Sequence, residues 1–175
     1  VLGKHLLNCA DAYAAERGFD VLEQGGEHYT WVLSRLAIEL EDLPSCHESF
    51  SIQTWVENVY RLFADRNFAI LNKDDKPIGY VRSVWAMISM ETRTPANLLA
   101  LHGERITNSI CEKECPIAKP GRVKVSQQKA MSEYVAKYSD LDINGHVNSI
   151  KYIEHILDLF PLDTYKEKAL KRFEI

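Results

Sequence analysis

The sequence lacks the long apolar run that a membrane-spanning helix requires. Such a helix needs ~20 consecutive apolar residues, and no stretch of the 175 residues comes close. A leader of basic, then apolar, then small residues is not seen either. We therefore expect no membrane partner and a cytoplasmic location.

Positive charge is not in excess. The formal net charge is −4, whereas a protein that binds nucleic-acid phosphates normally carries a surplus of Lys and Arg. We therefore expect no nucleic-acid partner. The remaining composition, with 46% apolar and 26% charged residues, is ordinary for a globular protein that buries a core.

Cysteine is scarce, with four residues in the chain. Cys111 and Cys115 form a lone C-x3-C pair without the second pair of ligands that a structural zinc site needs. Cys9 lies in a helical pattern and Cys46 lies beside a turn. We expect reduced thiols and no bound metal or other cofactor.

One short stretch is dense in polar side chains. From Tyr138 to Tyr152 the chain reads YSDLDINGHVNSIKY. Its segment from Asp140 to Gly145 matches the opening of an EF-hand calcium loop. Lys151 stands where that loop needs a bidentate glutamate, and a cation there repels the ion. We therefore reject the calcium site.

Acyl transfer to water fits the same stretch better. Asp142, Asn144 and His146 occupy alternate positions, so in an extended segment all three project to one side. The N-terminus of a following helix would add unpaired N–H groups, which form an anion site beside a base. The alternative is that these residues only make a tight turn and cap the helix.

A helix is expected directly after this stretch. Asn148 or Ser149 can cap its start, and Pro161 ends it after Phe160. Its apolar residues recur at helical spacing and form one face, namely Ile150, Ile153, Leu157 and Phe160.

The first half of the chain combines one helix with strands. The helix is expected from Lys4 to Arg17, with Gly18 as its C-cap. Strand-like runs cover Tyr29–Leu40, Glu48–Asn58, Tyr60–Leu71 and Ile78–Glu91. Short connections between them predict antiparallel pairing of successive strands. We predict an α+β hotdog fold, in which a long antiparallel sheet wraps around a central helix.

The order of elements then restarts. We expect a strand ending at Tyr138, the helix from Ser149, a second helix near Thr164 to Leu170, and a new strand opening at Lys171. Two hotdog units in tandem are therefore expected, the second cropped. The predicted boundaries are 1–95 for a first unit that lacks its first strand, 96–121 for a linker, and 122–175 for the N-terminal part of the second unit.

These motifs resemble those of a known family. The run DLDINGHVNSIKYIEHIL resembles the D-x-N-x-H-V-N-N signature of the acyl-ACP thioesterases of plants and bacteria, and only Ser149 departs from it. The segment from Trp31 to Leu40 resembles the W-x-L-S-R-x-x-V/I-E strand of those enzymes. Arg93 in METRTP resembles their D-T-R segment. The chain is identified as a member of this family on these matches, which occur in the right order.

The resemblance implies an activity and a partner. The expected reaction is hydrolysis of fatty acyl-ACP thioesters to free fatty acid and ACP, which terminates fatty acid synthesis, with the acyl carrier protein as partner. His146 would activate or position the water, Asn144 would orient the water or the carbonyl, and Asp142 would fix their geometry. A further catalytic carboxylate is expected beyond Ile175. The first unit would form much of the acyl pocket.

Other aromatic and histidine residues are weaker candidates. Trp31, Trp55 and Trp85 are candidates for lining an acyl channel, with plain core packing as the alternative. His102 and His155 have no partner constellation in the sequence and are expected to be surface residues or satisfied core residues.

Two alternative functions stay open at this point. A hotdog thioesterase acting on acyl-CoA has a signature that overlaps YSDLDINGHV, with Asp140 as the key carboxylate. If the substrate is acyl-ACP, Asp140→Asn should cause a small loss of activity and Asp142→Asn a large one. A non-catalytic module that binds acyl chains is the second alternative. The sequence leaves the oligomeric state open, a homodimer included.

Overall fold

The computed structural model describes residues 2–20, 22–122, 132–142 and 145–175. The chain divides into two compact units, Val1–Gly121 with Lys171–Ile175 and Arg122–Leu170. Within the described ranges, no helix is both long enough and apolar enough to cross a membrane.

The first unit opens with helix α1, Leu2–Glu16. Leu6, Ala10 and Ala14 are buried at a spacing of four residues, so they form one apolar face. Gly18 follows with φ +66°, and the Phe19 N–H donates to the Ala14 carbonyl at 2.8 Å. A left-handed residue at this point ends a helix, which confirms the predicted helix and its glycine.

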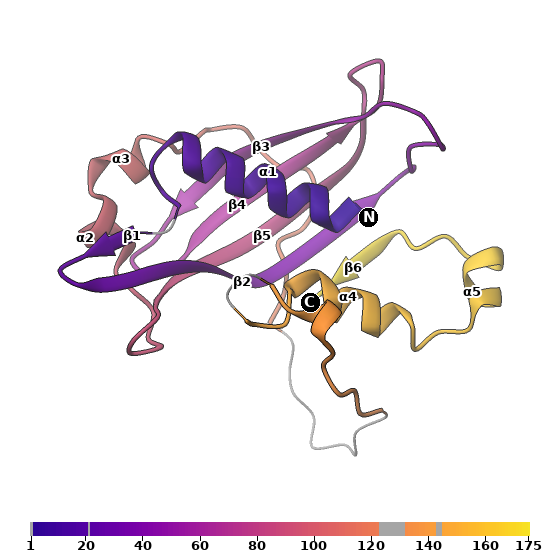
Figure 1. The fold of residues 1–175 in the computed structure, drawn as a ribbon. Coiled ribbons are helices and arrows are strands. Elements are labelled where there is room, and N and C mark those ends of the chain that lie inside the picture. The colour runs from indigo at the N-terminus through magenta and orange to yellow at the C-terminus, as the bar shows by residue number, and fades with distance from the viewer. Residues whose placement is uncertain (1, 21, 123–131, 143–144) are drawn as a thin grey trace. The chain divides into compact units, whose positions relative to one another are not determined.

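The strands of the first unit form one antiparallel sheet in the order β1-β2-β5-β4-β3, with β6 also paired to β2. The strands are β1 Leu22–Gln24, β2 Glu27–Leu40, β3 Ser51–Val59, β4 Ala64–Leu71, β5 Pro77–Ser89 and β6 Arg172–Glu174. Helix α1 lies across one face of this sheet (Figure 1). The predicted α+β class and the helix against a long antiparallel sheet are confirmed.

One predicted pairing was wrong. Successive strands pair for β3 with β4 and for β4 with β5, but β2 pairs with β5 and not with β3. The lengths of the strands explain why β2 pairs with β5. Strands β2 and β5 have 14 and 13 residues, so their pairing satisfies the most backbone groups. The connection over residues 41–50 is long enough to carry the chain to the far edge of the sheet.

The sheet buries apolar side chains on both faces. Ala64 packs with Ala14 of α1, whereas Ala69 packs with Cys115. Because these two alanines of β4 are an odd number of residues apart, they project to opposite faces. Two short helices, α2 Leu98–His102 and α3 Glu104–Thr107, precede the segment 111–121, which covers the face that α1 does not.

Gly79 of β5 provides a test of how closely β2 and β5 approach. A Cβ at this position would lie 2.6 Å from Leu40 Cδ2 and 2.8 Å from the Glu39 backbone oxygen. Because the backbone cannot yield, we expect Gly79→Ala to lower the free energy of unfolding by about 1–3 kcal/mol, measured by urea denaturation. Gly121→Ala is the control, since its nearest neighbour is 3.6 Å away. Equal midpoints for the two variants would contradict this packing.

The second unit contains a 3-10 turn η1, Tyr138–Asp140, helix α4, Ser149–Leu157, and helix α5, Leu162–Glu167. The predicted helix to Phe160 was too long. The Phe160 N–H donates to the carbonyl of Leu157, a tighter i→i+3 bond that ends the helix. The helical spacing of apolar residues therefore continues beyond the end of the helix. Helix α5 begins directly after Pro161, earlier than predicted.

The strand predicted to end at Tyr138 does not reach that residue, and the part of it before residue 132 lies outside the described residues. Residues 132–137 are irregular, and Tyr138 begins the 3-10 turn. A strand needs a neighbour for its backbone groups, and no described strand pairs with this segment. Val135 and Tyr138 are 84% and 94% exposed. The β-branched and aromatic residues here therefore gave a misleading local signal.

Candidate active site

Backbone hydrogen bonds join Asp142 to Gly145 and His146, so the chain reverses between these residues. The Asp142 N–H donates to the His146 carbonyl at 2.8 Å, the Gly145 N–H donates to the Asp142 carbonyl at 3.1 Å, and Leu141 forms an antiparallel bridge with Val147. Asp142 and His146 therefore pair with each other and do not continue one extended segment, while Ile143 and Asn144 lie outside the described residues. Gly145, with φ +73°, adopts the left-handed conformation that reverses the chain.

The turn brings Asp142 and His146 together by a different route. The Asp142 Oδ1 atom accepts a hydrogen bond from the His146 backbone N–H at 3.0 Å. Both residues are half-buried, so a substrate can reach them. Asn144, the third predicted catalytic residue, lies outside the described residues. The tight turn that the sequence suggested as an alternative is thus present, and it holds two candidate residues in a fixed geometry.

Helix α4 begins immediately after the turn. Asn148 is its N-cap, and its side chain accepts a hydrogen bond from the Ile150 N–H at 3.0 Å. This confirms the predicted cap and selects Asn148 over Ser149. Ile150 is buried at 5% exposure, which anchors the first turn of the helix. The positive end of α4 therefore follows closely after His146 in the chain, as an anion site would require.

Asp140 is buried and is the centre of a cluster that the sequence did not reveal. Its Oδ2 atom accepts hydrogen bonds from the Lys137 N–H at 2.7 Å and the Tyr134 hydroxyl at 2.8 Å. His155 Nε2 lies 3.3 Å from Oδ1. The Lys137 N–H first, and then Tyr134 and His155, hold the pKa of Asp140 below its usual value. The sequence showed no partner for His155, and the chain reversal supplies one in Asp140, so His155 is a satisfied residue.

Trp31 and Trp85 line a cavity of about 40 Å³ in the first unit. Its lining residues are Ala10, Asp11, Ala14, Phe19, Trp31, Val56, Ala64, Arg66, Trp85, Ile106 and Ser109. Trp55 is not among them. Its indole N–H donates to the Lys113 carbonyl at 2.8 Å, on the face covered by residues 111–121. A cavity of this size holds only a few water molecules, so a long acyl chain would enter only if side chains move.

Two charged residues in this cavity were not foreseen. Arg66 projects from β4 toward α1, where its guanidinium lies 4.3 Å from the centre of the Tyr13 ring. Burial lowers the pKa of Arg66 to about 10. Burial also raises the pKa of Asp11, with Arg66 opposing the shift. The two-residue alternation of β4 with Ala64 was the sequence signal that could have placed Arg66 on this face.

His102 is a core residue. The prediction that a core histidine here would have its hydrogen bonds satisfied was wrong. It is 3% exposed, and neither ring nitrogen has a hydrogen-bond partner among the described residues. Its ring stacks on Trp31 with an interplanar angle of 4° and meets Phe19 edge-on. Burial lowers the pKa of His102, with Arg105 adding to the shift. The neutral ring therefore packs as an aromatic side chain.

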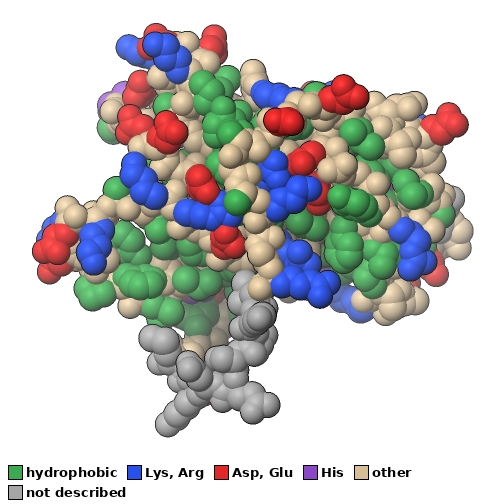
Figure 2. Space-filling view, turned by 180° about the vertical axis from the view of Figure 1, so that it is seen from behind, with side chains coloured by type: hydrophobic (Ala, Val, Ile, Leu, Met, Phe, Trp, Pro, Cys, Tyr) green, Lys and Arg blue, Asp and Glu red, His purple; other side chains and the backbone are tan. Residues whose placement is uncertain are grey.

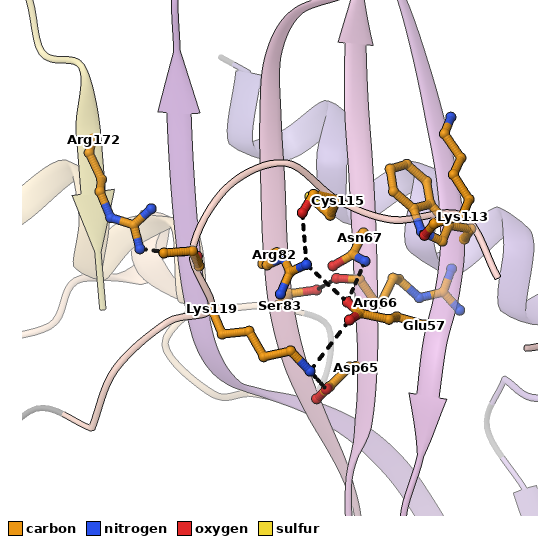
Figure 3. Close-up of polar contacts among 12 residues, drawn as sticks. Glu57, Asp65, Arg66, Asn67, Arg82, Ser83, Lys113, Cys115, Lys119 and Arg172 are labelled. Carbon is orange, nitrogen blue, oxygen red and sulfur yellow. Dashed lines mark hydrogen bonds and ion pairs between the residues drawn. The ribbon is translucent and has the colours of Figure 1, made fainter. Parts of the chain in front are cut away.

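A polar network lies on the face of the sheet opposite α1. Glu57, at a register shift in β3, accepts a hydrogen bond from the Asn67 amide at 2.7 Å and lies 3.6 Å from Arg82. Lys119 bridges Glu57 at 3.4 Å and Asp65 at 2.9 Å, as Figure 3 shows. Viewed from behind, basic and acidic side chains are interspersed on the surface (Figure 2).

Burial alone would raise the pKa of Glu57. The Asn67 hydrogen bond and the charges of Arg82 and Lys119 outweigh burial, so the pKa of Glu57 lies below its usual value. No described residues form a group of three or more Cys, His, Asp and Glu side chains that could hold a metal ion. Lys119 bonds to Glu57 and Asp65, and the Cys115 carbonyl accepts a hydrogen bond from Arg82. The network therefore fastens residues 111–121 to the sheet.

Comparison with known proteins gives matches along the chain. The family model for the acyl-ACP thioesterase N-terminal domain matches residues 2–100, and the model for the C-terminal domain of the same family matches residues 123–175. A curated relative, the chloroplastic palmitoyl-acyl carrier protein thioesterase of Gossypium hirsutum, is 26% identical over 93% of this chain and 41% of its own length. The chloroplastic oleoyl-acyl carrier protein thioesterase 2 of Arabidopsis thaliana is 27% identical over 82% of this chain and 42% of its own.

Solved structures agree with these matches. The crystal structure of an acyl-ACP thioesterase from Bacteroides thetaiotaomicron is 60% identical, with a TM-score of 0.88 over 99% of this chain and 70% of that one. The 12:0-ACP thioesterase from Umbellularia californica has the same fold, with a TM-score of 0.78 at 18% identity over 99% of this chain and 71% of that one. The chain spans less than half the length of the curated relatives it matches. On the two family models and the 60% identity, the chain belongs to the acyl-ACP thioesterase family.

Proposed function

We propose that the full-length protein hydrolyses fatty acyl-ACP thioesters, which releases free fatty acid and ACP and terminates fatty acid synthesis. The observation that carries the proposal is the turn from Asp142 to His146, which directly precedes the N-terminus of α4 within the stretch matched by the family's C-terminal domain. This arrangement supplies a base and an anion site at neighbouring positions.

Each residue of the turn has a role in this proposal. Histidine is the side chain best suited to take a proton at neutral pH, so His146 would accept one from the attacking water. The water oxygen bonds to the thioester carbonyl carbon, the C–S bond breaks, and the ACP thiol leaves with a proton. Asp142 would hold the turn through the His146 N–H, and Asn144 would orient water or the carbonyl. The further carboxylate predicted beyond Ile175 belongs to the same proposal.

The cavity lined by Trp31 and Trp85 is our candidate for part of the acyl pocket. Replacing Trp85 by phenylalanine enlarges this cavity, so we expect a several-fold shift of kcat/KM toward longer acyl chains, since one methylene in an apolar pocket is worth about 10-fold or more. Trp55→Phe is the matched comparison, because Trp55 packs on the other face of the sheet. The measurement is kcat/KM over a series of acyl-ACPs. An unchanged profile for Trp85→Phe, or equal shifts for both variants, would contradict this assignment.

The acyl carrier protein is the proposed partner, and a cytoplasmic location and a homodimer remain predictions. The activity is tested by incubating the full-length protein with acyl-ACP and measuring free fatty acid and ACP thiol by mass spectrometry. Stoichiometric release of both supports the proposal. Tight acyl binding without release would instead identify a non-catalytic acyl-binding module.

A further inference from the structure

Asp140 is connected to the chain on both sides of the candidate catalytic turn. Before the turn, its Oδ2 atom accepts the Lys137 N–H at 2.7 Å. After the turn, its backbone carbonyl accepts the Asn148 N–H at 2.8 Å. Asn148 is the N-cap of α4. One residue therefore fixes where the chain enters the turn and where the helix begins.

Two further side chains attach Asp140 to the body of the second unit. His155, on α4, places Nε2 3.3 Å from Oδ1. The Tyr134 hydroxyl donates to Oδ2 at 2.8 Å, and the Tyr134 ring lies against the His155 ring with 3.7 Å between centroids. The carboxylate thus joins the segment before the turn to the helix after it.

Burial separates Asp140 from any substrate. The residue is 2% exposed, and both carboxylate oxygens already have partners. A buried carboxylate whose oxygens are all hydrogen-bonded makes the groups around it rigid. Asp142 and His146, in contrast, are half-buried. The chemistry and the support are therefore assigned to different carboxylates.

From these contacts we propose that Asp140, with Tyr134 and His155, is the positioning group that holds Asp142 and His146 in their catalytic geometry. The inference rests on the proposed thioesterase function. It changes the meaning of the Asp140→Asn comparison suggested by the sequence, because loss of this carboxylate should be severe whichever carrier bears the acyl group.

The first test removes a single hydroxyl. In the full-length protein we expect Tyr134→Phe to lower kcat for acyl-ACP hydrolysis roughly tenfold with little change in KM, since small displacements of catalytic groups cost large factors in rate. Tyr138→Phe is the matched control. It lies in the neighbouring 3-10 turn and is 94% exposed, so its kcat should stay at the wild-type value.

The second test removes the charge of Asp140 and measures the stability of the turn directly. Asp140→Asn should lower kcat roughly a hundredfold and speed hydrogen exchange at the His146 and Asn148 amides, while amides of the first unit keep their wild-type rates. Wild-type kcat and wild-type exchange in both Tyr134→Phe and Asp140→Asn would overturn the positioning role. If the wild-type protein itself hydrolyses no acyl-ACP, the proposed function fails, but the exchange rates still test the support of the turn.

Discussion

Replacing His146 by alanine in the full-length protein should lower kcat for acyl-ACP hydrolysis by about 10²–10⁴-fold, the usual contribution of a positioned base. The backbone of the turn should survive, because the bonds that close it use the N–H groups of Asp142, Gly145 and His146, with main-chain carbonyls and the Asp142 carboxylate as acceptors. We therefore expect an unchanged thermal midpoint and an unchanged KM, which would separate a loss of chemistry from a loss of folding.

Asn144→Ala should give a loss of similar kind, because its amide would orient the water or the carbonyl. His47→Ala is the control, since His47 is an exposed histidine of the first unit. Steady-state kinetics on one acyl-ACP measure all three variants. Activities of His146→Ala and Asn144→Ala within a few-fold of wild type would remove these residues from the mechanism.

Arg82→Met should cause a large loss of stability. The Arg82 side chain is 12% exposed and that of Glu57 is 21% exposed, and Arg82 also donates to the Cys115 carbonyl at 2.8 Å. Removing one partner of a buried ion pair leaves the other charge poorly compensated, which costs about 3–5 kcal/mol. We expect a loss near the lower end, because Lys119 still lies 3.4 Å from Glu57. Urea denaturation of the purified protein measures it.

The stability difference between the wild type and Arg82→Met should depend on pH. Since the folded pKa of Glu57 is lowered, the stability it contributes is present above the ordinary carboxyl pKa of about 4.3 and is lost as the pH falls through the lowered value. The wild type and Arg82→Met should therefore differ most near neutral pH and converge in acid. Lys73→Met, in the turn between β4 and β5, is the exposed control. A constant difference across pH would contradict the role of the Glu57 charge.

Local patterns in the sequence were sufficient for much of the fold. The spacing of Leu6, Ala10 and Ala14 predicted α1, and Gly18 marked its end. What the sequence could not give was the partner of each strand. The pairing of β2 with β5 depends on matching lengths over a long separation in the chain, which local periodicity does not report.

The candidate site shows the same division. The residue types in the stretch from Asp142 to His146 pointed to acyl transfer, but the alternate spacing suggested an extended segment. The left-handed Gly145 instead lets the chain reverse, so that Asp142 and His146 pair with each other. The cluster of Tyr134, Asp140 and His155 was missed because a reversal of the chain creates it, and residues far apart in sequence carry no mutual pattern.

The central claim is tested most directly by one comparison of carriers. The full-length protein would be assayed with the same fatty acyl group on ACP and on CoA, and kcat/KM would be measured for each. We expect at least a tenfold preference for acyl-ACP, about 1.4 kcal/mol of differential transition-state binding. Equal values, or a preference for acyl-CoA, would contradict the proposed substrate.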